Sequence, residues 1–242
     1  MPDNPIYKTV LNKVIEEPTC AYYLISNNVI NVNSPDAKKV IQAIAKESFY
    51  AYQLILLVRE KNNSILSNPE YFQIILKSAI QDANFACNLI RHGILQYLFQ
   101  TNTIPNNPEY FQMTLNQALA DPLNARIIIS SNNMHPESIY FEQVLKKAVE
   151  DPSNAYDLLH YNLIPIQYEK YYLIALKAAI IIPIYAYRLI ENVPHKFKHL
   201  PESHAIKYLI KEHFINIEEA SDLIRPSNKN NYLQSIKNMF VK

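Results

Sequence analysis

Apolar residues along this chain recur with the period of an α-helix. From Phe141 to Val149 they occupy positions i, i+3, i+4, i+7 and i+8, which form one continuous helical face. A second apolar face, which includes Ala155, begins after Asp151-Pro152. Asp caps the first free N–H groups of a helix, and Pro fits the first helical position because its missing N–H would be unpaired there anyway. The pattern predicts two helices joined by a short junction.

The same pattern repeats along the chain. With Ala155 as an anchor, an alanine recurs at intervals of 30 to 39 residues; a Leu or Ile follows each by three positions, and another precedes each by ten. The anchor alanines are Ala21, Ala51, Ala86, Ala125, Ala155, Ala186 and Ala220. The residues after them are Leu24, Leu54, Leu89, Ile128, Leu158, Leu189 and Leu223, and those before them are Leu11, Ile41, Leu76, Leu115, Leu145, Leu176 and Ile210. Agreement at three positions in every unit predicts a repeat protein.

Helix boundaries also recur. Asn or Ser before Pro predicts the start of the first helix in four units: Asn4-Pro5, Ser34-Pro35, Asn68-Pro69 and Asn107-Pro108. A residue that tolerates the left-handed conformation, followed by a hydrophobic residue, predicts where the second helix stops: Asn28, Gly93, Asn133, Asn162 and Asn192. The longer intervals predict two enlarged, mobile connections, near Arg59–Leu66 and Leu95–Asn106.

We therefore expect an all-α protein, a right-handed α-solenoid of about seven two-helix repeats that forms a single domain over residues 1–242. The expected repeats cover residues 4–33, 34–66, 67–106, 107–134, 135–164, 165–199 and 200–242. Each would bury its apolar faces against its neighbours.

Two junctions carry a family resemblance. The segments ALADPLNA at 118–125 and AVEDPSNA at 148–155 are similar to the helix-to-helix junction of tetratricopeptide repeats. The chain departs from that family because it has no Trp, no Leu-Gly pair and no constant repeat length. It resembles a tetratricopeptide-like or HEAT-like α-solenoid, with no specific family named. The resemblance implies that the concave face binds a peptide or protein and that the fold itself carries no chemistry.

The scarcity of glycine excludes several classes of enzyme. Gly93 is the only glycine, whereas a P-loop, a dinucleotide-binding fingerprint or a nucleophile elbow each needs at least two. Cys87 has no histidine at a helical i+3 or i+4 position. His195 and His199 have metal-ligand spacing, but a metal site also needs a third ligand and a structured helix, and the segment lies between Pro194 and Pro201. We expect no catalytic residue, no metal and no cofactor.

The chain has no feature of a secreted or membrane protein. The N-terminus lacks a signal-peptide pattern, and the longest apolar run, near Ile180–Ile184, is too short to span a bilayer. Cys20 and Cys87 lie within apolar helical patterns and are expected to be free thiols of a reducing compartment. We expect a cytoplasmic protein. The Asn-, Ile- and Lys-rich composition is typical of AT-rich genomes, and an effector translocated from a bacterium into a host cell is one interpretation.

Tyrosines follow several anchor alanines and suggest a binding surface. Stacked repeats would align these residues as a stripe at the edge of the apolar face, where Tyr offers a large, rigid contact area. The candidate partner-binding residues are Tyr22, Tyr52, Arg126, Tyr156, Tyr187 and Arg188. The alternative is packing between repeats with the hydroxyl groups at the solvent. The aromatic pairs Tyr71-Phe72, Tyr110-Phe111, Tyr140-Phe141 and Tyr171-Tyr172 are expected to fill the core between units.

Charge separates the two ends of the chain. Residues 1–169 hold 12 basic and 16 acidic side chains, a net charge of −4, whereas residues 170–242 hold 11 and 6, a net charge of +5. A candidate basic patch consists of His195, Lys196, Lys198, Lys207 and Lys211. A solvated loop, a partner-binding patch and a nucleic-acid contact are the three interpretations of this segment.

These features favour a non-enzymatic protein that binds a protein or peptide partner and acts as an adaptor, inhibitor or regulator. One alternative is nucleic-acid binding through the basic C-terminal repeats. The other is an enzyme with an unrecognised site, which would require a pocket of titratable groups with strongly shifted pKa values.

Overall fold

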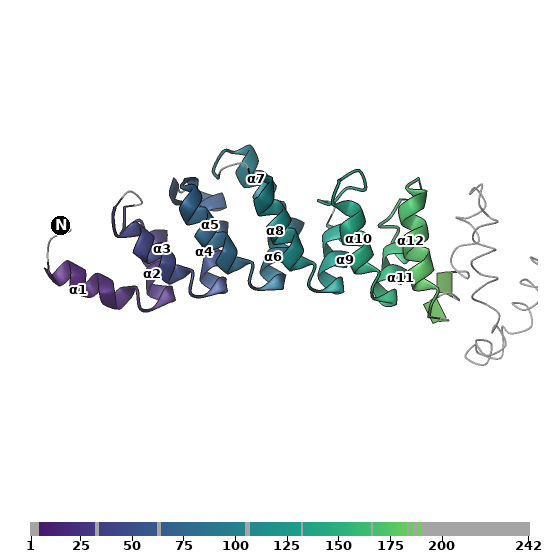
Figure 1. Ribbon diagram of the computed structural model, residues 1–242, viewed down its shortest axis with the longest axis horizontal. Helices are drawn as coiled ribbons and strands as arrows, with labels where there is room; N and C mark the ends of the chain where they lie inside the picture. The colour runs from purple at the N-terminus through teal and green to yellow at the C-terminus, as the bar shows by residue number, and fades with distance from the viewer. Residues whose placement is uncertain are drawn as a thin grey trace, which may run out of the picture. The chain divides into compact units, whose positions relative to one another are not determined.

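The computed structural model describes residues 5–31, 34–61, 64–104, 107–131, 133–165, 167–182, 184–185 and 188–189 (Figure 1). In this part of the chain, twelve α-helices and one short 3-10 helix form the regular structure. Contacts divide the chain into two compact units: unit 1 is Met1–Ala148, and unit 2 is Val149–Lys242. For the described residues the predicted all-α class is confirmed, and their helices pack in sequential pairs, as expected of helical repeats.

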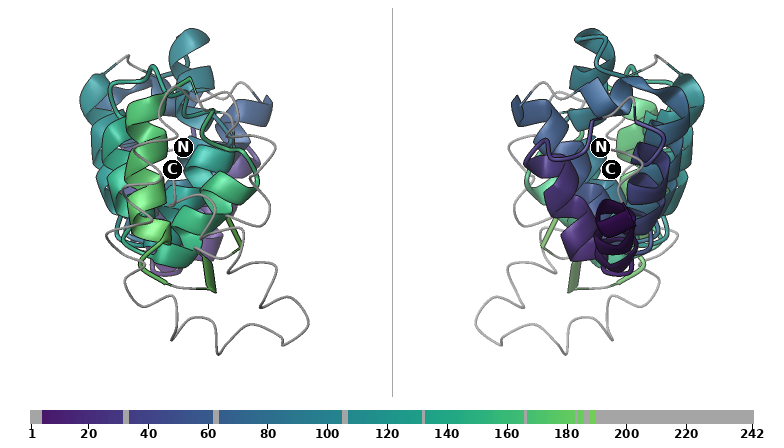
Figure 2. Two further views of the ribbon diagram at one scale, coloured as in Figure 1. Left: turned by 90° about the vertical axis from the view of Figure 1, so that its right-hand side faces the viewer. Right: turned by 90° about the vertical axis from the view of Figure 1, so that its left-hand side faces the viewer.

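Unit 1 contains the first ten helices. They are α1 (Pro5–Val14), α2 (Pro18–Ser26), α3 (Ala37–Ile44), α4 (Ser48–Lys61), α5 (Pro69–Ala79), α6 (Ala83–Arg91), α7 (Ile94–Gln100), α8 (Pro108–Ala118), α9 (Pro122–Ser130) and α10 (Phe141–Ala148), with the 3-10 helix η1 (Ser64–Ser67) between α4 and α5. Unit 2 contains α11 (Pro152–His160) and α12 (Glu169–Ala179). The end-on view of unit 1 in Figure 2 (right) has α1 and α2, in purple, nearest the reader.

Junctions of uniform length join the helices within unit 1. Each contains three residues: Ile15–Glu17, Ala45–Glu47, Ile80–Asp82 and Leu119–Asp121. Figure 1 shows them along one edge of unit 1, at the bottom of the view. In each case the N–H of the anchor alanine donates to the carbonyl of the last junction residue, for example Ala86 to Asp82 at 3.0 Å. The anchor therefore makes the first hydrogen bond of each helix that follows a junction.

The helices that pack closest are joined by the longer connections, not by the junctions. In unit 1 these pairs are α2 with α3, α4 with α5, α6 with α8, and α9 with α10; in unit 2 the pair is α11 with α12. Equivalent helices of neighbouring repeats also touch. The second helices α2 and α4 are in contact, as are the second helices α6 and α9 and the first helices α3 and α5. Each hairpin thus combines the second helix of one sequence repeat with the first helix of the next. The predicted repeat boundaries and the single domain stay predictions.

The three repeated sequence positions form the core. All five described anchor alanines, Ala21, Ala51, Ala86, Ala125 and Ala155, have no exposed surface. The apolar residues ten positions earlier are also buried, from Leu11 to Leu176. Of the apolar residues three positions after each anchor alanine, Leu24 is partly exposed. The others described are buried: Leu54, Leu89, Ile128, Leu158 and Leu189. Burial at these positions is the physical origin of the repeat.

Most of the predicted helix starts are confirmed. The side chain of Asn68 accepts from two backbone N–H groups, and Asn107, Asp121 and Asp151 each accept from one. The start predicted at Ser34-Pro35 is wrong, because α3 begins at Ala37. Ala37 N–H donates to the Ser34 carbonyl at 3.1 Å, and Pro35 therefore occupies the second position of a turn that precedes the helix.

The predicted helix stops are confirmed at three positions. Asn28, Gly93 and Asn162 have φ values of 55°, 61° and 55°. At Asn133 the helix stop stays a prediction; the side-chain amide of this residue donates to the Arg91 carbonyl at 2.6 Å. Asn102, with φ of 52°, is a left-handed residue that the recurring helix-stop pattern did not predict. Asn192 lies outside the described residues.

The two enlarged connections contain helical structure, contrary to the prediction of mobile loops. In the first, α4 extends to Lys61, and η1 places Leu66 in the core with no exposed surface. In the second, α7 buries Ile94, Leu95 and Leu98 and contacts α4 and α6. Apolar residues at i, i+1 and i+4 give this short helix one face to bury, which stabilises it against the neighbouring helices.

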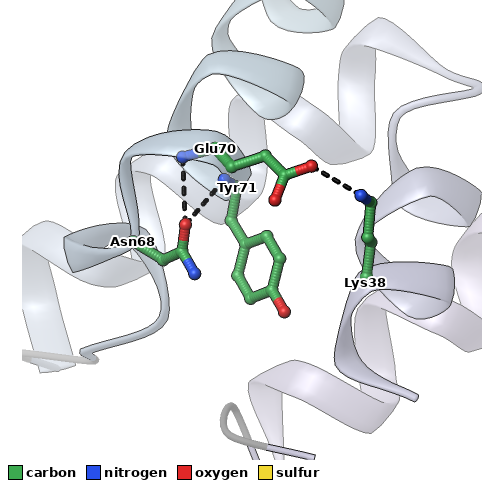
Figure 3. A network of polar contacts seen from close by, with 4 residues as sticks. All are labelled: Lys38, Asn68, Glu70 and Tyr71. Atoms are coloured by element: carbon green, nitrogen blue, oxygen red, sulfur yellow. Dashed lines mark hydrogen bonds and ion pairs between the residues drawn. The ribbon is translucent and has the colours of Figure 1, made fainter. Parts of the chain in front are cut away.

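A polar contact links two first helices of neighbouring repeats (Figure 3). Lys38 of α3 pairs with Glu70 of α5 at 2.6 Å, and Asn68 caps α5 beside it. The Glu70 side-chain hydrogen bond and charge raise the pKa of Lys38. Both side chains are about half exposed, so solvent screens the pair and its contribution to stability is small.

Candidate functional site

A row of aromatic rings crosses three helices of unit 1. Each ring contacts the next in the order Tyr23, Tyr22, Tyr50, Phe49, Phe85 and Tyr52, and we call them the aromatic ladder. The distances between successive ring centroids are 5.8, 5.9, 5.2, 6.3 and 4.7 Å. The rings come from α2, α4 and α6, so the ladder depends on how these helices pack.

The junctions position the ladder. Phe49 and Tyr50 lie in the first turn of α4, and Phe85 lies in the first turn of α6. The Asp82 carboxylate caps α6 by accepting from the backbone N–H groups of Asn84 and Phe85 at 2.7 and 3.3 Å. A junction of constant length therefore brings rings from successive helices to the same edge.

Polar contacts fix individual rings. The Thr19 hydroxyl of α2 donates to the Tyr50 hydroxyl oxygen of α4 at 2.7 Å. Tyr52 stacks on Phe85, with an angle of 5° between the ring planes. Burial raises the pKa of Tyr52, and the charge of Arg91 opposes this shift. The Tyr52 hydroxyl is therefore neutral at physiological pH.

The ladder combines buried and exposed rings. Tyr52, which stacks on Phe85, is 9% exposed, whereas Tyr23 and Phe49 are 57% and 49% exposed. Tyr22, Tyr50 and Phe85 have intermediate exposure. Exposed rings held against half-buried ones form a rigid apolar surface, because contact with neighbours limits the rotamers of their side chains.

Acidic side chains surround the first turns of the same helices. The four junctions of unit 1, which we call the junction edge, contain Glu16, Glu17, Lys46, Glu47, Asp82 and Asp121. One basic and five acidic groups give a net charge of 1 − 5 = −4. Glu17 precedes α2 without a side-chain bond to its N–H groups, and its carboxylate therefore faces solvent.

The structure brings two of the predicted partner-binding residues together. Tyr22 and Tyr52 both belong to the ladder, with three rings between them. Arg126 lies on α9 with intermediate exposure. In unit 2, Arg188 is exposed. Tyr187 and the basic patch of His195, Lys196, Lys198, Lys207 and Lys211 lie outside the described residues.

Tyr156 packs within unit 2. Its ring stacks on His160 at 5.2 Å and on Tyr185 at 5.0 Å, and its hydroxyl lies 3.3 Å from His160 Nδ1. It is 8% exposed, an environment that fits the packing alternative for this tyrosine.

One member of each aromatic pair is buried. These residues are Phe72, Tyr110, Phe141 and Tyr172, and Phe72 meets Tyr110 edge to face at 5.0 Å. The other members, Tyr71, Phe111, Tyr140 and Tyr171, are partly exposed.

The sequence pattern did not identify four of the ladder residues as part of a site. Phe49 precedes Tyr52 by three positions and therefore shares its helical face. Tyr50, Tyr23 and Phe85 occupy positions directly beside an anchor alanine or one step further. A search for aromatic residues at all positions of the first two turns, instead of one position only, would have found them.

The described residues contain no group of three or more His, Cys, Asp or Glu that could hold a metal ion. Burial raises the pKa of Cys87 to about 11, which leaves this thiol protonated and unreactive at neutral pH, and Cys20 is an exposed thiol. No helix within the described ranges is long and apolar enough to cross a membrane.

Comparisons with protein-family models, with curated proteins and with solved structures find no match for this chain.

Proposed function

We propose that this chain is a non-enzymatic helical-repeat protein that binds a protein or peptide partner through the aromatic ladder. In this role it acts as an adaptor, inhibitor or regulator. The observation that carries the proposal is the exposure of Tyr23 and Phe49 within a continuous row of six contacting rings.

Contiguous exposed apolar surface is the feature that supports binding. Single exposed hydrophobic residues are common, but a contiguous patch is typical of an interaction site. Aromatic rings are enriched in binding hot spots because they bury a large area with little loss of side-chain entropy. The ladder meets both criteria, and half-buried neighbouring rings hold its exposed rings in place before a partner arrives.

The proposal includes a right-handed α-solenoid over residues 1–242. Its support is the repetition of one junction, one anchor hydrogen bond and one pairing of helices through unit 1. In a solenoid the second helices of successive repeats lie side by side, and this arrangement extends a binding surface along the array.

Affinity capture from a native lysate tests the binding role. The variant Tyr23→Ser/Phe49→Ser removes the two exposed rings, and Val29→Ser/Ile139→Ser is the control because Val29 and Ile139 are 65% and 86% exposed outside the ladder. Wild type and control should retain a stoichiometric protein partner that the ladder variant loses. Circular dichroism should show that all three proteins have the same helical content.

Equal capture by the ladder variant and the control would refute the proposed site. Capture of nucleic acid instead of protein, lost as salt increases, would refute the class of partner.

A further inference from the structure

We propose that the aromatic ladder and the junction edge together bind an extended, arginine-containing segment of a partner protein. This inference rests on the proposed function and specifies the chemistry of its partner. It combines the exposed rings on α2 and α4 with the carboxylates that immediately precede these helices.

Charge complementarity identifies the sign of the partner. The junction edge has a net charge of −4, and the inclusion of Lys13 and Lys77 from the last turns of α1 and α5 still leaves −2. Glu16, Glu17 and Glu47 are exposed and form no ion pair with any described residue. A cationic segment would therefore meet carboxylates that are not already neutralised.

The chemistry of the rings favours arginine. A guanidinium group placed over the face of Tyr or Phe is attracted by the ring quadrupole, and its fork of N–H groups can also bind a carboxylate. Glu47 precedes Tyr50 of the ladder by three positions, a spacing at which side chains of one helix are neighbours. One guanidinium group can thus reach both a ring and a carboxylate at the start of α4.

The spacing of the rings favours an extended backbone. Alternate side chains on one face of a β-strand are about 6.6 Å apart. Successive ladder rings are 5.2 to 6.3 Å apart between Tyr22 and Phe85, which nearly matches this repeat. An extended segment that crosses α2, α4 and α6 would place every second side chain near a new ring.

The same charges disfavour a nucleic acid at this surface. Bases can stack on exposed rings, but a nucleic-acid site also needs basic side chains along the backbone path. The junction edge instead has an excess of carboxylates, which would repel phosphate groups.

The first experiment measures the affinity of short fluorescent peptides for the full chain by anisotropy. The probe is Arg-Leu-Arg-Leu-Arg, with Gln-Leu-Gln-Leu-Gln and Glu-Leu-Glu-Leu-Glu as references. The arginine peptide should bind about tenfold or more tightly than the glutamine peptide, and the glutamate peptide should not bind. Its affinity should fall as the salt concentration rises, because solvent-exposed ion pairs are screened.

Variants locate the binding site. Tyr23→Ser/Phe49→Ser should weaken binding of the arginine peptide about tenfold, and Glu17→Gln/Glu47→Gln about fivefold. Matched controls are Ile139→Ser for apolar surface and Glu109→Gln for charge, because both residues are exposed and lie outside the ladder and the junction edge. If the serine variant is unstable, Phe49→Leu replaces it in the test. This substitution keeps much of the apolar area but removes the π face, and it should also weaken binding of the arginine peptide.

Equal affinity for the three peptides, or full affinity in the ladder and charge variants, would overturn the inference. Preferential binding of a single-stranded oligonucleotide would also overturn it. Competition with the captured partner separates the two proposals. If capture depends on the ladder but the arginine peptide does not compete, the cationic inference fails and the proposed function stands. If capture does not depend on the ladder, the proposed function fails.

Discussion

The edge-to-face pair of Phe72 and Tyr110 should couple two neighbouring repeats energetically. Phe72 of α5 has no exposed surface, and Tyr110 of α8 is 7% exposed. Their ring centroids are 5.0 Å apart, with 71° between the planes. Such pairs contribute about 0.5–1.5 kcal/mol beyond the burial of their surface. The perturbation is a double-mutant cycle of Phe72→Leu and Tyr110→Leu.

Leucine retains much of the buried apolar volume at both positions. Each single substitution should lower the free energy of unfolding by about 1.5 kcal/mol. The double variant should lose about 1 kcal/mol less than the sum of the two, because the ring pair can be lost only once. Urea unfolding followed by far-ultraviolet circular dichroism measures the three differences.

A second cycle provides the control. No described ring contact joins Phe72 to Phe141, which is also fully buried but lies on α10. Phe72→Leu and Phe141→Leu should therefore be additive within about 0.5 kcal/mol. Strict additivity in the Phe72–Tyr110 cycle would refute the view that the aromatic pairs join neighbouring repeats, and so would an equal coupling in the control cycle.

Four further predictions concern single residues. Gly93→Ala should lower the free energy of unfolding by about 1 kcal/mol in urea denaturation, because φ of 61° disfavours a side chain; an unchanged midpoint would contradict this. Asp121→Ala should lower it by about 1 kcal/mol in the same assay because α9 loses its cap, whereas an unchanged stability would mean that the cap contributes nothing. At neutral pH a disulfide reagent should modify the exposed Cys20, but it should modify Cys87 only after unfolding because burial raises the pKa of Cys87 to about 11. Equal rates of modification of the two thiols in the folded protein would refute the burial of Cys87. Burial raises the pKa of Tyr172 from 10.0 to about 12. The stability linked to this group is therefore present below pH 10 and is lost as the pH rises from 10 to about 12. A spectrophotometric titration in which every tyrosine ionises near pH 10 without unfolding would contradict this prediction.

The core of the fold follows from the sequence because burial constrains side chains strongly. At Ala51, Ala86 and Ala125 the backbone of a helix lies in a space without room for solvent, and the sequence shows this as a recurring small residue. Caps are equally local: Asp121 and Asn68 bond to N–H groups two or three residues away. Local spacing is enough to predict both features.

The pairing of helices does not follow from the sequence. Periodicity indicates which face of a helix is buried, but it does not identify the neighbour that covers this face. Helix α4 illustrates the problem, because it contacts α2, α5, α7 and η1. Its buried residues therefore surround much of the helix and leave little amphipathic signal.

The ladder was only partly predictable for a related reason. Tyr22 and Tyr52 share one position of the repeat, but their connection passes through Tyr50, Phe49 and Phe85. These contacts depend on the rotation and shift of α2, α4 and α6 relative to one another. Tertiary packing determines these quantities, and a single sequence does not reveal them.

The junctions of unit 1 are uniform in length and its other connections are variable, so one edge of the unit should tolerate inserted residues and the other should not. Every junction has three residues, whereas the connections at the opposite edge include η1, α7 and the α9–α10 segment with Ile139 86% exposed (Figure 1). Exposed connections tolerate inserted sequence far better than tightly bonded turns. An epitope or fluorescent reporter placed beside Ile139 would leave the register of the helices intact, whereas one extra residue in a junction would rotate every ring that follows it.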